Sequence, residues 1–356
     1  MRLAARTTLL SYPTRTHARP LPTPPPHARA IKMASSAPPI GRDATPPTAP
    51  PGHAARVVPD VAAGSAAVAA LVRSAADAAI GARGAFTLVL SGGSLVACLA
   101  PLAGAPDAEH WHVFWADERC VPLSSEDSNY RGACEAFLDK VRRGGGGGGG
   151  VKREARPGVP LSPTSARARA RCLEEVLDLS HAFALALPLS LFSLQSGIPP
   201  SQIHAISDAP GLSPAAAAAD YEARLKALPP AVLPREEGKD GKTWPAFDLV
   251  LLGVGPDGHV ASLFPGLGAV EDDSGAWVLG VGDSPKPPPE RISLSLGAIN
   301  AAAATAVVAL GAGKAPIVGA ALGGGGEEGS ALLPVQRVRS AGGVTWVLDE
   351  GAAGEL

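Results

Sequence analysis

The residues best suited to chemistry lie in the segment FDLVLLGVGPDGHVASLFPG, from Phe247 to Gly266. An apolar run typical of a buried strand ends there in a glycine-rich turn that carries Asp257 and His259. We expect His259 to begin a short helix, which Pro265 ends because proline lacks an N–H and clashes with the preceding turn. The positive end of that helix would disfavour protonation of the imidazole, and a general base requires a neutral imidazole. A loop histidine bonded to a backbone carbonyl is the structural alternative.

The same turn is open to other assignments. Gly253, Gly255 and Gly258 satisfy G-x-G-x-x-G, the fingerprint of dinucleotide-binding sites, but that fingerprint requires a full helix after the third glycine. Pro265 ends the expected helix too early, so no nicotinamide or flavin cofactor is expected. No second histidine or cysteine lies at metal-ligand spacing, and there is no G-x-S-x-G elbow for a serine nucleophile. A water molecule activated by His259 therefore fits these residues best.

A second polar segment favours anion binding. In SGGS, from Ser91 to Ser94, Gly92 and Gly93 allow the backbone to approach an anion closely. Ser94 can add a hydroxyl donor at the start of the next helix. A tight strand-to-helix turn explains the same residues equally well.

The segment ADERCVPLSSEDSNY places Asp117, Glu118 and Arg119 at the end of a predicted strand. Arg119 is a candidate for bidentate recognition of a phosphate or sugar acid, with the two acids orienting it or holding sugar hydroxyls. A surface ion pair is the alternative. Asn129 lies at the start of the next predicted helix, where it can serve as a cap.

These motifs follow elements that alternate along the chain. Predicted strands cover 86–90, 111–117, 247–252, 277–281, 291–296, 306–310 and 344–348, and predicted helices cover 61–82, the residues after SGGS, 129–141 and the residues from 213. Short, nearly continuous apolar strands between helices predict an α/β fold with a mostly parallel sheet and helices on both faces. Ligands bind outside the carboxyl ends of such strands, where SGGS, ADER and GPDGH all fall.

Residues 1–52 depart from this pattern. They are rich in proline, carry arginine, serine and threonine, and contain no acid before Asp43. That composition favours an organelle transit peptide, plastid rather than mitochondrial, over an untargeted disordered tail. Met33 offers a second start that would give a cytosolic form.

Residues 141–195 depart from it as well. They include a glycine run from Gly144 to Gly150 and the stretch LALPLSLFSLQ, so we interpret them as a low-complexity insertion in a domain spanning 53–356. A Leu/Pro/Ser/Phe run that ends in glutamine is what a pyrimidine tract followed by CAG encodes. A retained intron translated in frame is therefore a specific hypothesis for this block.

Composition argues against several classes of partner. The formal net charge is −2 and no basic stripe with interleaved aromatic residues occurs, so neither nucleic acid nor an anionic membrane is expected. The four cysteines, Cys98, Cys120, Cys134 and Cys172, show no metal or redox spacing. No stretch is expected to reach the roughly 18–20 apolar residues of a transmembrane helix.

Taken together, the motifs closely resemble the 6-phosphogluconolactonase family. The segments that carry the resemblance are SGGS, WHVFWADERCVP…SNY, GIPPSQIHAI, FDLVLLGVGPDGHVASLFPG, RISLSL, LGAGKA and VTWVLDEGAAGEL, in that order. They cover nearly all of 57–140 and 197–356, and joining Lys140 to Ser196 restores the family's order. Leu95-Val96 replaces the family's usual Thr-Pro after SGGS, which removes one hydroxyl near the expected phosphate site.

The resemblance implies a Rossmann-like α/β fold in a single catalytic domain, shared with glucosamine-6-phosphate deaminases and ribose-5-phosphate isomerases. It implies hydrolysis of 6-phospho-D-glucono-1,5-lactone without a required cofactor in the oxidative pentose phosphate pathway, with glucose-6-phosphate dehydrogenase as functional neighbour. We separately expect a monomer and no metal. His259 would take a proton from water and return it to the ring oxygen, while Asp257 orients His259 or the water. The residues expected to bind the phosphate and the hydroxyacyl chain are Gly92, Gly93, Ser94, Asp117, Arg119, Asn129, Arg291 and Lys314.

Two alternatives stay open. A sugar-phosphate deaminase–isomerase follows Asp-Gly-His with a Phe-Asn-Glu-Pro-Gly type sequence that supplies a carboxylate, whereas this chain has ASLFPG from Ala261 to Gly266. A non-catalytic sugar-phosphate-binding protein would bind without turnover, but it gives no reason for an intact Asp-Gly-His.

Overall fold

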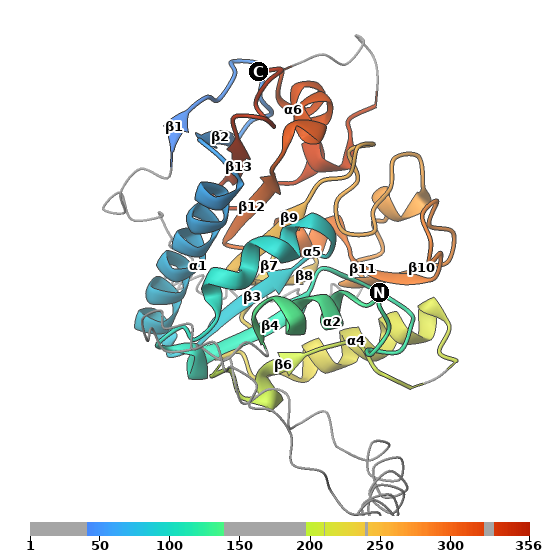
Figure 1. Ribbon diagram of the computed structural model, residues 1–356. Helices are drawn as coiled ribbons and strands as arrows, with labels where there is room; N and C mark the ends of the chain where they lie inside the picture. The colour runs from blue at the N-terminus through green and yellow to red at the C-terminus, as the bar shows by residue number, and fades with distance from the viewer. Residues whose placement is uncertain (1–40, 139–196, 210, 239–240, 324–330) are drawn as a thin grey trace, which may run out of the picture. The chain divides into compact units, whose positions relative to one another are not determined.

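The computed structural model describes residues 41–138, 197–209, 211–238, 241–323 and 331–356, and its centre is an eight-stranded sheet (Figure 1). Every neighbouring pair of strands in this sheet is parallel except β1 and β2. In their order across the sheet, the strands are β1 (Arg42–Asp43), β2 (His53–Val58), β13 (Val344–Asp349), β12 (Ala304–Ala309), β9 (Leu249–Gly253), β3 (Phe86–Leu90), β4 (Trp111–Trp115) and β6 (Ile203–His204). The mostly parallel sheet predicted from the sequence is confirmed.

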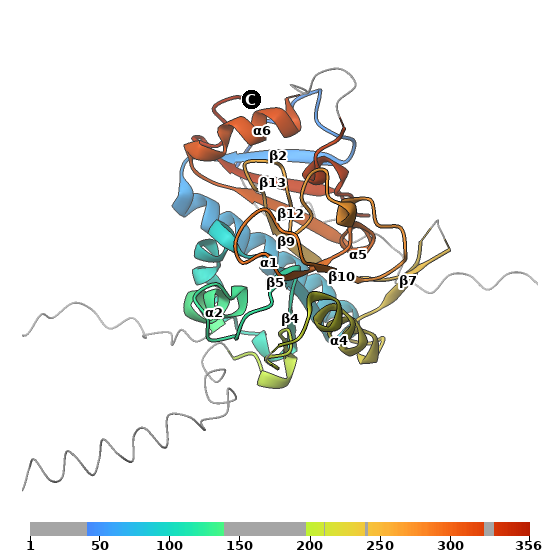
Figure 2. The ribbon, with the colours of Figure 1, turned by 90° about the vertical axis from the view of Figure 1, so that its right-hand side faces the viewer.

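The central strands are buried on both faces. In β9, Leu249 and Leu251 pack into one hydrophobic core, while Val250 and Leu252 pack into the other. The first core includes α1 (Val61–Arg83), the 3-10 helix η2 (Gly93–Leu102), and α2 (Asn129–Ala133) with its π-helical continuation η4 (Cys134–Leu138). The second includes α4 (Pro214–Ala227), α5 (Leu296–Asn300) and α6 (Ala315–Leu322). Helices therefore cover both faces of the sheet, as predicted (Figure 2).

α1 is the long helix of the first core. Asp60 caps its start by accepting a hydrogen bond from Ala63 N at 2.8 Å, and Gly84 ends it in the left-handed conformation. Within the described part of the chain, α1 is long and apolar enough to cross a membrane, which the sequence analysis overlooked. Half of its most apolar window is buried inside the fold, and core helices pass the same test.

A second sheet of three antiparallel strands corrects one prediction. Its strands are β10 (Val278–Val281), β11 (Arg291–Leu294) and β5 (Asp117–Arg119). The sequence predicts that the strand from Trp111 continues to Asp117 and that β10 and β11 belong to the main sheet, and the structure contradicts both predictions. The chain leaves the main sheet at Ala116, whose N–H donates to Leu90 O at 2.8 Å while its carbonyl accepts from Leu294 N at 2.7 Å. Apolar patterning identifies strand residues but not their partner strands.

A buried ion pair between Arg83 and Asp248 lies at the edge of the main sheet where the parallel strands begin. Arg83, at the end of α1, donates through Nη1 to Asp248 Oδ1 at 2.8 Å. Asp248 Oδ2 also accepts from Thr87 N at 2.8 Å and from Thr87 Oγ1 at 2.7 Å. This network joins α1, β3 and β9 at the edge opposite to the strand ends that carry the polar motifs.

The remaining elements are short. They are η3 (Ala108–His110), η6 (Pro200–Gln202), the hairpin of β7 (Arg235–Glu237) and β8 (Thr243–Pro245), η7 (Gly268–Val270), η8 (Ala312–Lys314) and η9 (Pro334–Arg337). Residues 41–52, which composition assigned to the leader, include β1 and its pairing with β2. The rest of the predicted leader and the whole predicted insertion at 141–195 lie outside the described residues.

Candidate active site

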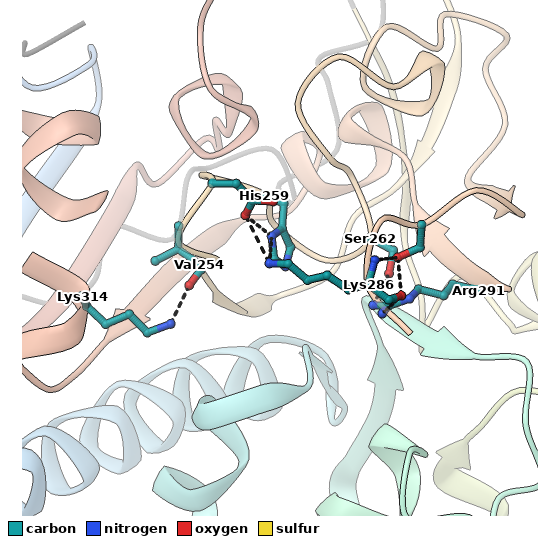
Figure 3. A network of polar contacts seen from close by, with 8 residues as sticks. Val254, His259, Ser262, Lys286, Arg291 and Lys314 are labelled. Atoms are coloured by element: carbon teal, nitrogen blue, oxygen red, sulfur yellow. Dashed lines mark hydrogen bonds and ion pairs between the residues drawn. The ribbon is translucent and has the colours of Figure 1, made fainter. Parts of the chain in front are cut away.

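Asp257 and His259 lie in the turn that follows β9, at the carboxyl end of a central strand. Figure 3 shows His259 in this turn. Gly255 N donates to His259 O at 3.0 Å, and Gly258 N donates to Gly255 O at 3.0 Å. Gly258 has a φ of +81°, a conformation that favours glycine. The tight turn brings the two functional side chains together.

No helix follows His259, so the short helix predicted there is wrong. Val260 pairs with Leu263 in an isolated β-bridge, and Ala261 has a φ of +48°. A positive φ is incompatible with a right-handed helix. The helix dipole expected to keep His259 neutral is therefore absent, and the charge of the ring depends on burial and neighbouring groups.

His259 Nδ1 lies 2.5 Å from Asp257 Oδ1. Burial lowers the pKa of His259 although Asp257 opposes the shift, and the positive charge of Lys286 lowers it further. Burial alone would raise the pKa of Asp257, but the hydrogen bond and charge of His259, together with Lys286, lower it below its usual value. The pair is therefore a carboxylate and a neutral imidazole, in which Nδ1–H donates to Asp257 and Nε2 carries the lone pair.

Nε2 of His259 has no hydrogen-bond partner among the residues that the structure describes. The ring packs on Phe264, with 4.5 Å between the ring centroids. An oriented, neutral imidazole with a free Nε2 can take a proton from a water molecule.

Lys286 is a site residue that the sequence analysis missed. Its Nζ lies 3.4 Å from Asp257 Oδ1 and 3.3 Å from His259 Nδ1. Because Nδ1 already donates to Asp257, the hydrogen bond of Lys286 goes to the carboxylate. A lysine in the proline-rich stretch SPKPPP is typical of a solvated loop, so the sequence offered no signal for this contact.

Arg291 fixes the loop that carries Lys286. Its guanidinium is buried, with Nε donating to Pro288 O at 2.9 Å and Nη2 donating to Lys286 O at 2.8 Å. Nη1 lies 3.4 Å from Ser262 Oγ. Arg291 is predicted to bind an anion, but much of its donor capacity is used by the loop.

Asp117 links three strand ends beneath this loop. Its Oδ2 accepts from Ser262 Oγ at 2.9 Å, and its Oδ1 lies 3.3 Å from Ser91 Oγ. Ser262 follows β9, and Ser91 follows β3. The predicted convergence of the three motifs at one edge of the sheet is therefore observed.

Arg119, Asn129 and Gly92 form the adjoining part of the site. Arg119 faces Arg291 across the β5–β11 pair, donates through Nη1 to Asp127 O at 2.7 Å, and has a buried Nε with no partner in the described structure. Asn129 Nδ2 donates to Asp117 O at 2.8 Å. A Cβ on Gly92 would lie 1.9 Å from Asn129 Oδ1, so this glycine is required by packing.

The other predicted binding residues differ in position. Lys314 reaches the turn after β9, where its Nζ donates to Val254 O at 2.8 Å (Figure 3). Burial lowers the pKa of Lys314, and so does the charge of Lys286. Gly93, with φ of +75°, and Ser94 are exposed, and no hydrogen bond of the Ser94 hydroxyl joins it to these residues in the described structure.

A groove in the described structure lies away from these residues. It has a volume of about 540 Å³ and is lined by Lys226, Arg235, Lys242, Thr243, Ser274, Gly275 and Trp277. Arg235 donates to Leu228 O at 3.3 Å, and Lys226 forms an ion pair with Glu222. Cations at the end of α4 complement the negative end of the helix dipole, so this groove has a structural explanation.

The strand-end site thus combines a carboxylate-held imidazole with four cationic side chains, those of Arg119, Lys286, Arg291 and Lys314. No group of three or more His, Cys, Asp or Glu side chains in the described part of the chain is arranged to hold a metal ion. Fold and site geometry define a class of α/β enzymes whose ligand sites lie at the carboxyl ends of parallel strands. The sequence model of the glucosamine-6-phosphate isomerases/6-phosphogluconolactonase family matches residues 59–178 and 186–346, and the chain belongs to this family.

Individual relatives agree with this assignment. The chain is 37% identical to "6-phosphogluconolactonase 3, chloroplastic" of Arabidopsis thaliana over 77% of its own length and 66% of that relative. It is 39% identical to "Probable 6-phosphogluconolactonase 4, chloroplastic" of Oryza sativa subsp. indica over 77% of its length and 68% of that relative. The chain thus spans about two thirds of these relatives.

A solved structure shares the fold. The 6-phosphogluconolactonase of Trypanosoma brucei superposes with a TM-score of 0.58 at 24% identity, covering 85% of this chain and 98% of that chain. At this identity the likeness shows the Rossmann-like α/β fold alone.

Proposed function

We propose that the chain hydrolyses 6-phospho-D-glucono-1,5-lactone to 6-phospho-D-gluconate, the lactonase step of the oxidative pentose phosphate pathway. The observation that carries the proposal is the Asp257–His259 pair, with Nδ1 held at 2.5 Å and Nε2 free. The names of the similar plant proteins support this choice of reaction within the family.

The proposed reaction uses water as the nucleophile. His259 Nε2 accepts a proton from water as the oxygen attacks the lactone carbonyl carbon, and Asp257 stabilises the imidazolium that forms. The tetrahedral intermediate then collapses, the bond from the carbonyl carbon to the ring oxygen breaks, and His259 returns the proton to that oxygen. A positioned base of this kind contributes typically about 10²–10⁴-fold.

The cationic side chains bind the anionic parts of the substrate in this proposal. Arg119 is the strongest candidate for the phosphate because its Nε has no partner and its neighbour Arg291 adds positive charge. Lys286 contacts Asp257 of the catalytic pair, and Lys314 bonds the carbonyl of Val254 in the turn that carries this pair. Fixing the phosphate away from the carbonyl carbon keeps the lactone in register with the attacking water.

The segment after His259 favours hydrolysis over deamination–isomerisation. The segment ASLFPG contains no carboxylate that could lie next to the imidazole. Its polar side chain is that of Ser262, whose hydroxyl donates to Asp117 at 2.9 Å. The isomerase alternative needs such a carboxylate, and a non-catalytic binding protein needs no free base.

One assay separates the three functions. The full-length protein is supplied with 6-phosphogluconolactone made in place from glucose 6-phosphate, and acid release is followed above the spontaneous rate. We expect turnover of the lactone and none of glucosamine 6-phosphate. Turnover of the amino sugar alone would support the isomerase, and binding of 6-phosphogluconate without turnover would support a sensor.

We also propose plastid targeting by the leader, because the similar plant proteins carry "chloroplastic" in their names. A start at Met33 would give a cytosolic form. Recovery of the mature N-terminus from isolated plastids tests the proposal, and a protein found only in the cytosol contradicts it.

A protein without residues 141–195 should keep the activity if that block is an insertion, and loss of folding on deletion would refute the interpretation.

A further inference from the structure

Glu118 is the buried acid of the strand-end cluster that the proposed mechanism does not use. The register of β5 on β11 pairs Arg119 with Arg291 and Glu118 with Ile292. Successive side chains of a strand point to opposite faces. Arg119 and Asp117 therefore face the site, whereas Glu118 faces away from it and is only 1% exposed.

Each carboxylate oxygen of Glu118 accepts two hydrogen bonds. Oε1 accepts from Arg119 N at 2.7 Å and Asn129 N at 2.8 Å. Oε2 accepts from Tyr130 N at 2.8 Å and Ser128 Oγ at 3.2 Å. Asn129 and Tyr130 begin α2, and the first amides of a helix have no partner within it. Glu118 supplies these partners and ties α2 to β5.

The start of α2 carries the adjoining part of the site. Asn129 Nδ2 donates to Asp117 O, and its Oδ1 packs directly on Gly92 of the SGGS loop. Arg119 Nη1 donates to Asp127 O, two residues before α2. A shift of α2 would therefore move Asn129 and remove its packing contact with Gly92. The same shift would change the orientation of the Arg119 guanidinium.

We infer that Glu118 is a positioning residue for the anionic end of the substrate, because it holds β5 and α2 at the spacing that sets Arg119, Asn129 and Gly92 around a phosphate. The inference rests on the proposed function, since it assigns a role within the same site. Glu118 does not contact Asp257 or His259, so its loss should weaken binding and leave the chemical step nearly unchanged.

The test is Glu118→Gln in the full-length chain. The amide has nearly the same shape, but its NH₂ faces the N–H of Tyr130, so a donor meets a donor. We expect faster hydrogen exchange at Asn129 and Tyr130, and a dissociation constant for 6-phosphogluconate about tenfold higher, as for the loss of a hydrogen bond to a charged group. The value of kcat should change by less than about twofold, because the catalytic pair is untouched.

Glu135→Gln is the matched control. Glu135 is exposed and bonds Arg131 Nε at 2.8 Å, so this variant makes the same substitution near α2 without touching the amides of its first turn. Exchange and affinity should equal those of the wild type. Glu118→Asp, which keeps the charge on a shorter chain, should bind more weakly than the wild type and more tightly than Glu118→Gln, and it also serves if the glutamine variant does not fold.

Each outcome decides a separate question. Unchanged exchange at Asn129 and Tyr130, unchanged affinity in both Glu118 variants, or a loss of kcat with unchanged affinity would overturn the positioning role. A wild-type protein that does not bind 6-phosphogluconate would count against the proposed function, while the exchange data would still decide whether Glu118 holds α2 in place.

Discussion

Gly255 and His259 are in such close contact that a Cβ atom on Gly255 would lie 2.0 Å from Cε1 and Nδ1 of the imidazole. The same Cβ would lie 2.6 Å from Asp257 Oδ1. The absence of a side chain at Gly255 is therefore what allows the Asp257–His259 pair to occupy its position.

Gly255→Ala should displace the imidazole and lower kcat for the lactone by about 100-fold, the cost expected for a misplacement of about 1 Å. Gly268→Ala is a suitable control, because a Cβ there meets no atom within 4 Å. Steady-state kinetics on both variants make the comparison. A normal kcat in Gly255→Ala would show that the ring does not need this position.

Asp257→Asn should reduce kcat without unfolding the protein. The amide NH₂ would donate to Nδ1 of His259, so the proton would move to Nε2 and remove the base. A loss of at least about 10²-fold is expected, since the equivalent substitution in a carboxylate–histidine–serine triad costs about 10⁴-fold. Measurement of kcat at the plateau of the pH profile tests this, and a loss below about threefold would mean that Asp257 does not set the tautomer.

Lys286→Met should move the acid limb of the kcat profile to higher pH. The positive charge of Lys286 lowers the pKa of His259, so its removal raises that pKa and requires a higher pH for the neutral base. Profiles of wild type and variant should be compared with those of Lys226→Met, a change in the distant groove. A shift to lower pH, or no shift, would contradict the contact between Lys286 and the catalytic pair.

The strand ends and their convergence were predictable from the sequence, but several contacts within the site were not. The apolar run before Gly253 and the motifs at 91–94 and 117–119 carry local signals, and their shared edge follows from the parallel sheet. Lys286 reaches His259 only because Arg291 holds the intervening loop by three carbonyls. Such a contact depends on tertiary structure that a proline-rich sequence does not encode in any local pattern.

The two errors of local prediction have a similar origin. ASLFPG contains residues that helices accept, yet Ala261 takes a positive φ and Ser262 bonds Asp117, so tertiary contacts override the local preference. Asp117 continues the apolar strand in sequence, but the chain changes sheets at Ala116. Within β5 the two acids point to opposite faces, so Asp117 bonds Ser262 and Glu118 bonds the amide of Asn129.

The contribution of His53 to stability should fall as the pH drops below about 6.5, the pKa of histidine in an unfolded chain. Burial lowers the pKa of His53, which accepts at Nδ1 from Trp346 Nε1 and lies 2.9 Å from Val338 O through Nε2. The unfolded state then binds more protons than the folded state, so unfolding becomes easier in acid. Urea unfolding between pH 5.5 and 7.5 measures this slope.

His53→Gln isolates the contribution of His53. Burial raises the pKa of Glu118 to about 7, and this contributes a slope of opposite sign in both proteins. The variant should be less stable at pH 7.5 and should lose less additional stability on acidification than the wild type. If the free energy of unfolding changed with pH by the same amount in the two proteins, protonation of His53 would not be linked to folding.

The central claim is that His259 Nε2 removes a proton from water, and turnover by His259→Ala under saturating 6-phosphogluconolactone tests it most directly. We predict that kcat falls by at least about 10²-fold, while the dissociation constant for 6-phosphogluconate stays within about threefold of the wild type because the cationic side chains are retained. A variant that hydrolyses the lactone at near the wild-type rate would contradict the claim.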